Sequence, residues 1–89
     1  MQLEAGLPIE VVESKFLANH YMYSVYYSLR DKVSKDFALK SLKHERENAI
    51  CFMRNKNIPE EKIKIALKNA ADERKKELAL IGITPELLY

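Results

Sequence analysis

Residues that build covalent or metal-bound scaffolds are scarce in this chain of 89 residues, which holds one Cys, two His, two Gly, three Pro and no Trp. One Cys cannot close an internal disulfide, and one Cys with two His supplies too few ligands for a structural zinc site. Two isolated glycines cannot form a phosphate-binding loop or a dinucleotide fingerprint. The chain also lacks the apolar run of about 18 residues that a membrane helix needs and a basic-then-apolar leader. We therefore expect no metal, no membrane partner and a cytoplasmic protein.

Catalytic groups are equally hard to assemble from this sequence. It contains no nucleophile elbow. His44 and Cys51 share a helix face, but seven residues separate them by about 10 Å along the helix axis, which is too far for a nucleophile and its base. His20 falls on the polar face of its predicted helix, where solvation explains it. We therefore expect a protein that is not an enzyme and that carries no cofactor.

Composition and charge indicate one small globular domain over residues 1–89. Hydrophobic residues make up 47% and charged residues 31% of the chain, with a net charge of +2. Only residues 30–56 are biased, with a net charge of +4. A nucleic-acid-binding domain of this size is usually more basic, with a pI above about 9, whereas this sequence has a pI near 8.7. Duplex nucleic acid is therefore not an expected partner.

The few Gly and Pro residues divide the chain into helices. Pro8 suits the start of the first helix, Ser34 suits an N-cap, and Pro59 suits the start of a third helix. Gly82 suits a left-handed C-cap on which Ile83 folds back. No strand-like alternation is present. The fold class is therefore all-α, with long helices over about 8–31, 35–56 and 59–81, and a short helical turn over 84–88. Short connections make the three helices antiparallel neighbours.

The first helix carries apolar side chains around about half of its circumference, more than the stripe of about 100° that a single partner covers. It therefore needs two partners, which are either the two other helices of the chain or a second copy in a homo-oligomer. Its two adjoining apolar faces comprise Val12, Phe16, Asn19, Tyr23, Tyr26, Tyr27 and Arg30 on one side, and Val11, Ala18, Met22, Val25, Leu29 and Val33 on the other.

Charged residues interrupt the apolar stripes of the other two helices. Glu45 lies within the stripe of the second helix, and Arg74 and Glu77 lie within that of the third. A charge on an apolar face is costly unless it is paired. Two interpretations stay open: a core-edge ion pair such as Glu45 with Arg74 or Arg30, or a polar pocket or subunit interface.

Tyrosines cluster next to basic residues. A tyrosine stripe at helical spacing is typical of a core, but Tyr next to Arg and Lys is also typical of a surface that stacks bases and neutralises phosphates. Asn commonly reads an adenine edge. The candidate ligand-binding residues are Tyr23, Tyr26, Tyr27, Arg30, Lys43, Arg46 and Asn48.

The run from Glu45 to Arg54, a polar, then small, then Phe-Met pattern on the second arm of a helical hairpin, resembles the phage anti-CBASS proteins that sequester cyclic oligonucleotide second messengers. The resemblance implies a hexamer that binds cyclic di- or trinucleotides at subunit boundaries without chemistry, in the cytoplasm of the host cell, and so blocks host defence signalling. Of the family's functional residues, only those in the segment around Arg46 and Asn48 can be carried over to this sequence.

The sequence supports three hypotheses. The first is a non-enzymatic oligomer that sequesters a ligand, with a cyclic oligonucleotide as the ligand. The second is a small helical inhibitor or adaptor that binds a larger protein through its first helix. The third is a weak nucleic-acid-binding regulator that uses the basic second helix.

Overall fold

A computed structural model describes residues 8–89; residues 1–7 of the predicted domain lie outside that range. The described residues form helices and no strand, which confirms the all-α class. The elements are α1 (Ile9–Asp31), α2 (Lys35–Asn55), α3 (Glu60–Glu73), α4 (Lys75–Ala79) and a 3-10 turn, η1 (Pro85–Leu88). No helix among them has the length and apolarity to cross a membrane.

Local chemistry sets the ends of these helices much as predicted. The hydroxyl of Ser34 accepts a hydrogen bond of 3.1 Å from the backbone N–H of Phe37 and so caps α2. Gly82 takes the left-handed conformation at a φ of 75°, and the N–H of Ile83 returns to the carbonyl of Leu78 at 3.0 Å. Only a residue without a Cβ adopts that φ freely. These caps confirm the predicted α1–α2 connection and the C-terminal turn.

The prediction of one continuous third helix is wrong, because the helix breaks at Arg74. There the backbone has a φ of −103° and a ψ of 21°, so α3 ends and the short α4 begins. The guanidinium of Arg74 donates to the carbonyl of Ala18 in α1 at 3.2 Å. The break redirects the chain along α1 and leaves Leu78 and Ile83 fully buried.

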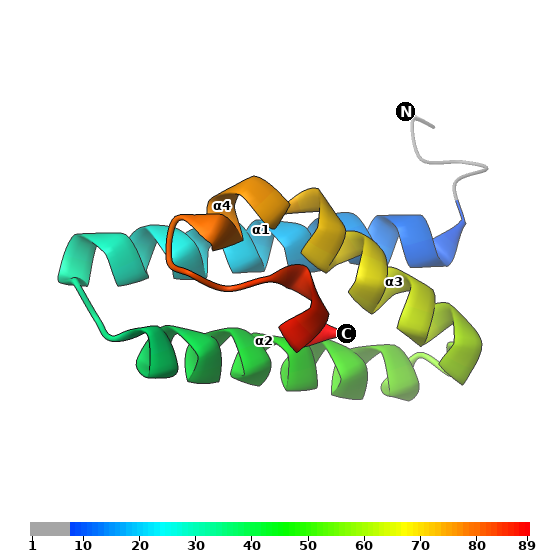
Figure 1. The fold of residues 1–89 in the computed structure, drawn as a ribbon. Helices are drawn as coiled ribbons and strands as arrows, with labels where there is room; N and C mark the ends of the chain where they lie inside the picture. The colour runs from blue at the N-terminus through cyan, green and yellow to red at the C-terminus, as the bar shows by residue number, and fades with distance from the viewer. Residues whose placement is uncertain (1–7) are drawn as a thin grey trace, which may run out of the picture.

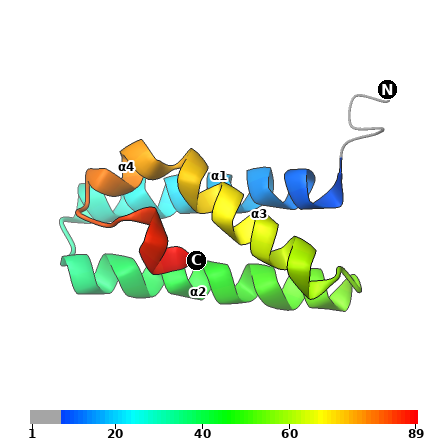
Figure 2. The ribbon, with the colours of Figure 1, turned by 45° about the vertical axis from the view of Figure 1, so that its right-hand side comes forward.

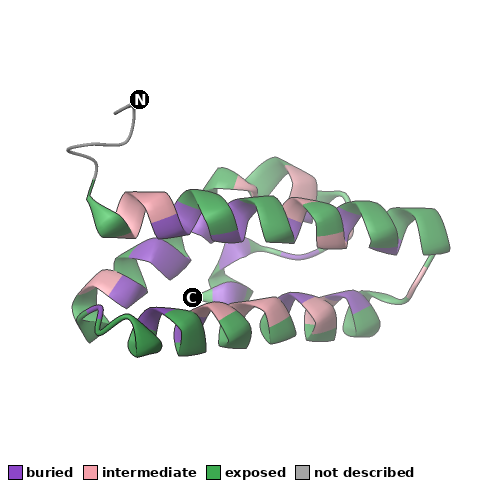
Figure 3. Cartoon of the chain, turned by 180° about the vertical axis from the view of Figure 1, so that it is seen from behind, coloured by how far each residue is buried: buried purple, intermediate pink, exposed green. Residues whose placement is uncertain are grey.

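The three long segments form an incomplete bundle. α1 and α2 make an antiparallel hairpin, and α3 crosses one side of it diagonally, with α4 and η1 on the same side (Figures 1 and 2). α1 contacts α3 more extensively than it contacts α2. The other side of the hairpin carries no helix formed by residues 8–89 (Figure 3). α1 therefore has one covered side and one open side.

The core lies between the hairpin and the elements that cross it. From α1 it takes Leu17, Ala18, Tyr21 and Val25, which recur at helical spacing and are 0–2% exposed. The prediction for this helix was wrong about Tyr21 and Leu17, which belonged to neither proposed apolar face. The other large, fully buried side chains are Leu42, Met53, Leu78, Ile83 and Leu88.

Candidate functional site

The open side of the hairpin is hollowed along its length, between α1 and α2. One hollow of about 440 Å³ lies toward the α1–α2 connection, and a second of about 380 Å³ lies toward the other end. His20 and Glu45 line both hollows. The two hollows therefore form one continuous groove, which we call the α1–α2 groove, with His20 and Glu45 at its centre.

Aromatic side chains line this groove from both helices. α1 contributes Phe16, Tyr23 and Tyr27, and α2 contributes Phe37 and Phe52. Each of these five side chains is between 46% and 58% exposed. Soluble monomers rarely leave a contiguous apolar patch of this kind uncovered unless it binds something. We name these five residues the aromatic lining.

A polar contact spans the middle of the groove. His20 Nδ1 lies 3.5 Å from Glu45 Oε1, and both side chains are partly exposed, at 45% and 35%. The ring of Phe16 packs edge-on against His20 with ring centres 4.8 Å apart. His20, predicted to be merely solvated, is thus held in the groove by Phe16 and faces Glu45.

Every acid in the groove lining has a positive or protonatable neighbour. Glu13 is buried and pairs with Lys56 at 3.1 Å, at one end of the groove. Asp31 accepts a hydrogen bond from Arg30 at the other end, which lowers the pKa of the Asp31 carboxyl. Among the described residues, the lining of the two hollows contains no Lys or Arg. The groove therefore offers no cation along its floor, and the acids at its two ends are compensated by Lys56 and Arg30.

Cations stand at the two ends of the groove, each against an aromatic ring of the lining. The guanidinium of Arg30 lies 4.7 Å from the ring centre of Tyr27. The ammonium of Lys56 lies 4.4 Å from the ring centre of Phe52. Such contacts fix ring orientation at modest energy. They hold the aromatic side chains at each end in place.

The predicted ligand-binding residues divide between the groove and other surfaces. Tyr23, Tyr27 and Asn48 line the groove, and Arg30 stands at its end. Tyr26 and Lys43 are exposed but line none of the three hollows described in this section. Arg46 lines neither part of the groove. The structure therefore brings Tyr23, Tyr27 and Asn48 together, with Arg30 close by, and places the other three predicted residues elsewhere.

Arg46 instead fastens the C-terminal turn to α2. Its guanidinium donates to the main-chain oxygens of Leu88 and Tyr89, at 2.9 Å each, and pairs with Glu47 at 2.8 Å. It lines a third hollow of about 290 Å³ with Lys64, Leu67, Lys68 and Tyr89. These contacts give the Arg46 side chain a structural task.

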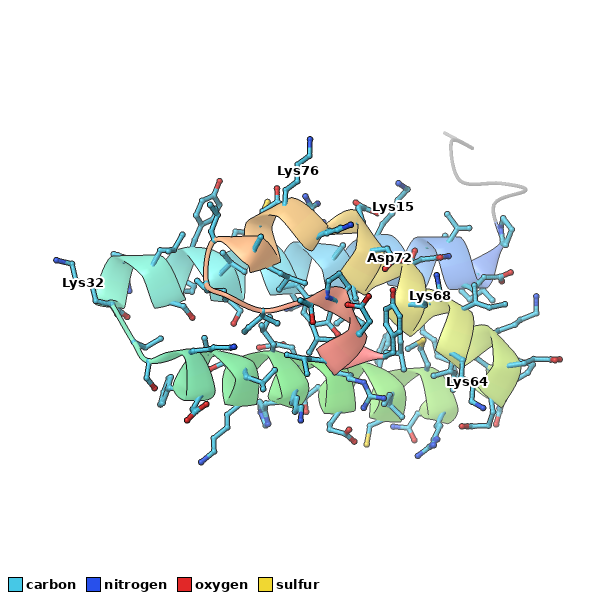
Figure 4. All side chains as sticks on the ribbon, in the orientation of Figure 1. Lys15, Lys32, Lys64, Lys68, Asp72 and Lys76 are labelled. Atoms are coloured by element: carbon cyan, nitrogen blue, oxygen red, sulfur yellow. The ribbon has the colours of Figure 1, made fainter. Side chains whose placement is uncertain are left out.

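The same C-terminal turn is held from α3. The Tyr89 hydroxyl donates to Asp72, which also pairs with Lys68 at 2.9 Å. Both hydrogen bonds lower the pKa of the Asp72 carboxyl. Figure 4 shows Lys68 and Asp72 side by side on α3, above the C-terminal turn. The third hollow therefore lies where residues 85–89 are anchored to α2 and α3.

Over residues 8–89, the structure does not contain the predicted ion pair between Glu45 and Arg74 or Arg30. Glu45 faces His20 and forms no ion pair with Arg74 or Arg30 within the described residues. Arg74 bonds to Ala18 and lies near Glu73 and Glu77, at 3.4 and 3.8 Å. Glu45 thus belongs to the groove, whereas Arg74 and Glu77 stabilise the junction of α3 and α4.

Four groove residues with ring side chains were not among the predicted ligand-binding residues, namely Phe16, His20, Phe37 and Phe52. A weak signal for them exists, because Phe16, His20, Tyr23 and Tyr27 recur every three or four residues and so share one face of α1. Phe37, Ser41 and Glu45 do the same on α2.

Comparison with protein-family models, curated proteins and solved structures found no match. Within residues 8–89, no three His, Cys, Asp or Glu side chains are grouped so that they could hold a metal ion. The α1–α2 groove is therefore the feature from which a function can be inferred.

Proposed function

We propose that this chain is a non-catalytic binding module that holds an apolar α-helix of a protein partner in the α1–α2 groove. The observation that carries the proposal is the aromatic lining: five aromatic side chains, each about half exposed, face a groove whose lining contains no Lys or Arg.

The shape of the groove favours a helix as the occupant. It runs between two antiparallel helices on the side that α3 leaves uncovered (Figure 3), so an added helix would complete a four-helix arrangement. Amphipathic helices bind such grooves through apolar residues at positions i, i+3, i+4 and i+7. The two hollows on either side of the centre give these side chains two places to enter.

The chemistry of the lining also favours a protein partner. Aromatic residues that become buried on binding are the commonest source of binding energy at protein interfaces. The central His20 and Glu45 supply polar groups for one polar residue of the guest helix. A phosphate-bearing ligand would instead need Arg or Lys within the lining, and the acids Glu13, Asp31 and Glu45 stand there instead.

Sequestration of a cyclic oligonucleotide is the second candidate. It is supported by Tyr23, Tyr27 and Asn48, which line one groove and could stack on or read bases. It is weakened by Arg46, its expected phosphate contact, which is hydrogen-bonded to the C-terminal turn outside the groove. We therefore place it second.

A displayed library of amphipathic helices tests the first candidate directly. We expect helices with the i, i+3, i+4, i+7 pattern to be selected by the wild-type protein and to lose at least about 30-fold in affinity for the Tyr23→Glu variant, as for the loss of a central anchor. Tyr26→Glu is the matched control, since Tyr26 is 60% exposed on the same helix but lies outside the lining. Failure of the monomeric protein to select any helix, or equal binding to both variants, contradicts the proposal.

A further inference from the structure

We infer that the partner is a second copy of this chain, whose α1–α2 hairpin covers the first, groove against groove, around a two-fold axis that crosses α1 and α2 at their midpoints. The inference rests on the proposed function, because both use the α1–α2 groove as the binding surface.

The groove is nearly symmetric about its centre, as a self-complementary interface requires. His20 is the middle residue of α1 and Glu45 the middle residue of α2. Phe37 and Phe52 lie eight and seven residues from Glu45, which is about 11–12 Å to either side. A two-fold axis at the centre therefore places the Phe37 end of one copy over the Phe52 end of the other.

The same axis brings the aromatic residues of the two α1 helices into register. Phe16 lies four residues before His20, whereas Tyr23 and Tyr27 lie three and seven residues after it. In the antiparallel pair, Phe16 of each copy lies opposite Tyr23 of the other, offset by one residue or about 1.5 Å along the helix axis. This offset suits aromatic contact between the two rings across the interface.

Charge leaves the two ends of this face free to pair. Glu13 lies next to Lys56 and Asp31 next to Arg30, whereas Glu45 faces His20, which forms an ion pair with it only when protonated. The ends of the face are therefore compensated in charge and meet those of a second copy without like-charge repulsion. The two His20–Glu45 contacts come together at the axis as a polar layer, and such layers fix the register of paired helices.

The available area is sufficient for a stable pair. The chain is flat, with extents of 39 × 26 × 18 Å, and the hairpin occupies one broad side (Figures 1 and 3). The outline of that side is about 1,000 Å², compared with the about 800 Å² per partner that standard specific interfaces bury.

Sedimentation over a wide range of concentrations tests the pairing. We expect a dimer whose dissociation constant rises at least about 30-fold in Tyr27→Glu and in Phe52→Glu, and is unchanged in Tyr26→Glu. Because Tyr27, Phe52 and Tyr26 are all about half exposed, helical circular dichroism should be the same for all four proteins. A wild-type monomer, or a dimer that none of the groove variants weakens, overturns the inference.

Cross-linking tests the axis, in a background in which Cys51→Ser removes the exposed natural thiol. Phe37→Cys and Phe52→Cys chains, mixed, should form an intermolecular disulfide, and neither chain should form one alone. Like positions lie about 22 Å apart along the antiparallel helices, whereas a disulfide needs Cα atoms within about 7 Å. Disulfides within one variant alone overturn the arrangement.

The helix library separates this inference from the proposed function. A monomeric wild-type protein that still binds selected helices through Tyr23 overturns the self-pairing and leaves the proposed function standing. A monomeric protein that binds no helix overturns both.

Discussion

The two sides of α1 differ in what covers them rather than in their chemistry. Tyr21 points to the side that α3 covers and is 0% exposed, whereas Tyr23, two residues on, points into the groove and is 57% exposed. Both sides present aromatic and aliphatic groups at helical spacing. Apolar character in a helix therefore does not by itself distinguish a core surface from a binding surface. The distinction depends on how many helices are available to cover that surface.

The largest difference between the two sides is expected when each tyrosine is truncated to alanine. Tyr21→Ala removes a fully buried ring and should lower the free energy of unfolding by about 3–5 kcal/mol. Tyr23→Ala should change it by no more than about 0.5 kcal/mol. Urea denaturation followed by circular dichroism, at one fixed protein concentration low enough to keep every variant monomeric, measures both. Equal losses for the two variants would show that the groove side is buried as deeply as the core.

Two arginines, Arg46 on the covered side of the hairpin and Arg30 on its open side, should differ in their contribution to stability. Arg46→Ala removes the hydrogen bonds that hold the Leu88 and Tyr89 main-chain oxygens on the covered side, so we expect a loss of about 1.5–3 kcal/mol. It should also make residues 85–89 accessible to a protease. Arg30→Ala, at the exposed end of the groove, should leave the denaturation midpoint unchanged. If the Arg46→Ala variant is as stable as the wild type, Arg46 does not hold the C-terminal turn in place.

At alkaline pH the stability of the protein should depend on the buried phenol of Tyr21. Burial raises the pKa of the Tyr21 phenol, so the folded protein keeps a proton that the unfolded chain releases near pH 10. The stabilisation that Tyr21 contributes is therefore complete below pH 10. Above it, the free energy of unfolding of the wild type should fall, relative to Tyr21→Phe, by up to about 1.4 kcal/mol per pH unit.

The matched control for this pH effect is Tyr23→Phe, which removes the same hydroxyl group from an exposed tyrosine and leaves Tyr21 in place. At neutral pH, Tyr21→Phe should lose no stability, because the Tyr21 hydroxyl has no hydrogen-bond partner within the described residues. If the Tyr21→Phe and wild-type curves stay parallel above pH 10, the hydroxyl is in contact with solvent.

Much of the fold could be predicted because it depends on local chemistry. Ser34 caps α2 and Gly82 takes the left-handed turn wherever the rest of the chain lies. The break at Arg74 could not be predicted in this way, since its guanidinium bonds to Ala18, 56 residues away. No Gly or Pro marks that break in the sequence.

The candidate site was predictable in part for the same reason. Tyr23 and Tyr27 share a helix face, so helical spacing alone places them together. That this face is the open one, and that Tyr21 is core, depends on where α3 crosses α1 (Figure 2). The bonds from Arg46 to Leu88 and Tyr89 span more than forty residues. No pattern within α2 indicates them, so the sequence alone could not show that Arg46 holds the C-terminal turn.

The smallest expected effect is that of a cyclic nucleotide on the open side. The groove lining holds Tyr23, Tyr27 and Asn48 but no Lys or Arg, so stacking would have to act without phosphate neutralisation, and we expect no binding tighter than about 10 μM, or roughly 7 kcal/mol. Isothermal titration with a panel of cyclic di- and trinucleotides measures this. Tighter binding that Tyr23→Ala abolishes and Tyr26→Ala preserves would reverse the ranking of the two functions. In that case the phosphates must meet Arg30 or Lys56 at the ends of the groove, since these are the cations that stand against its aromatic rings.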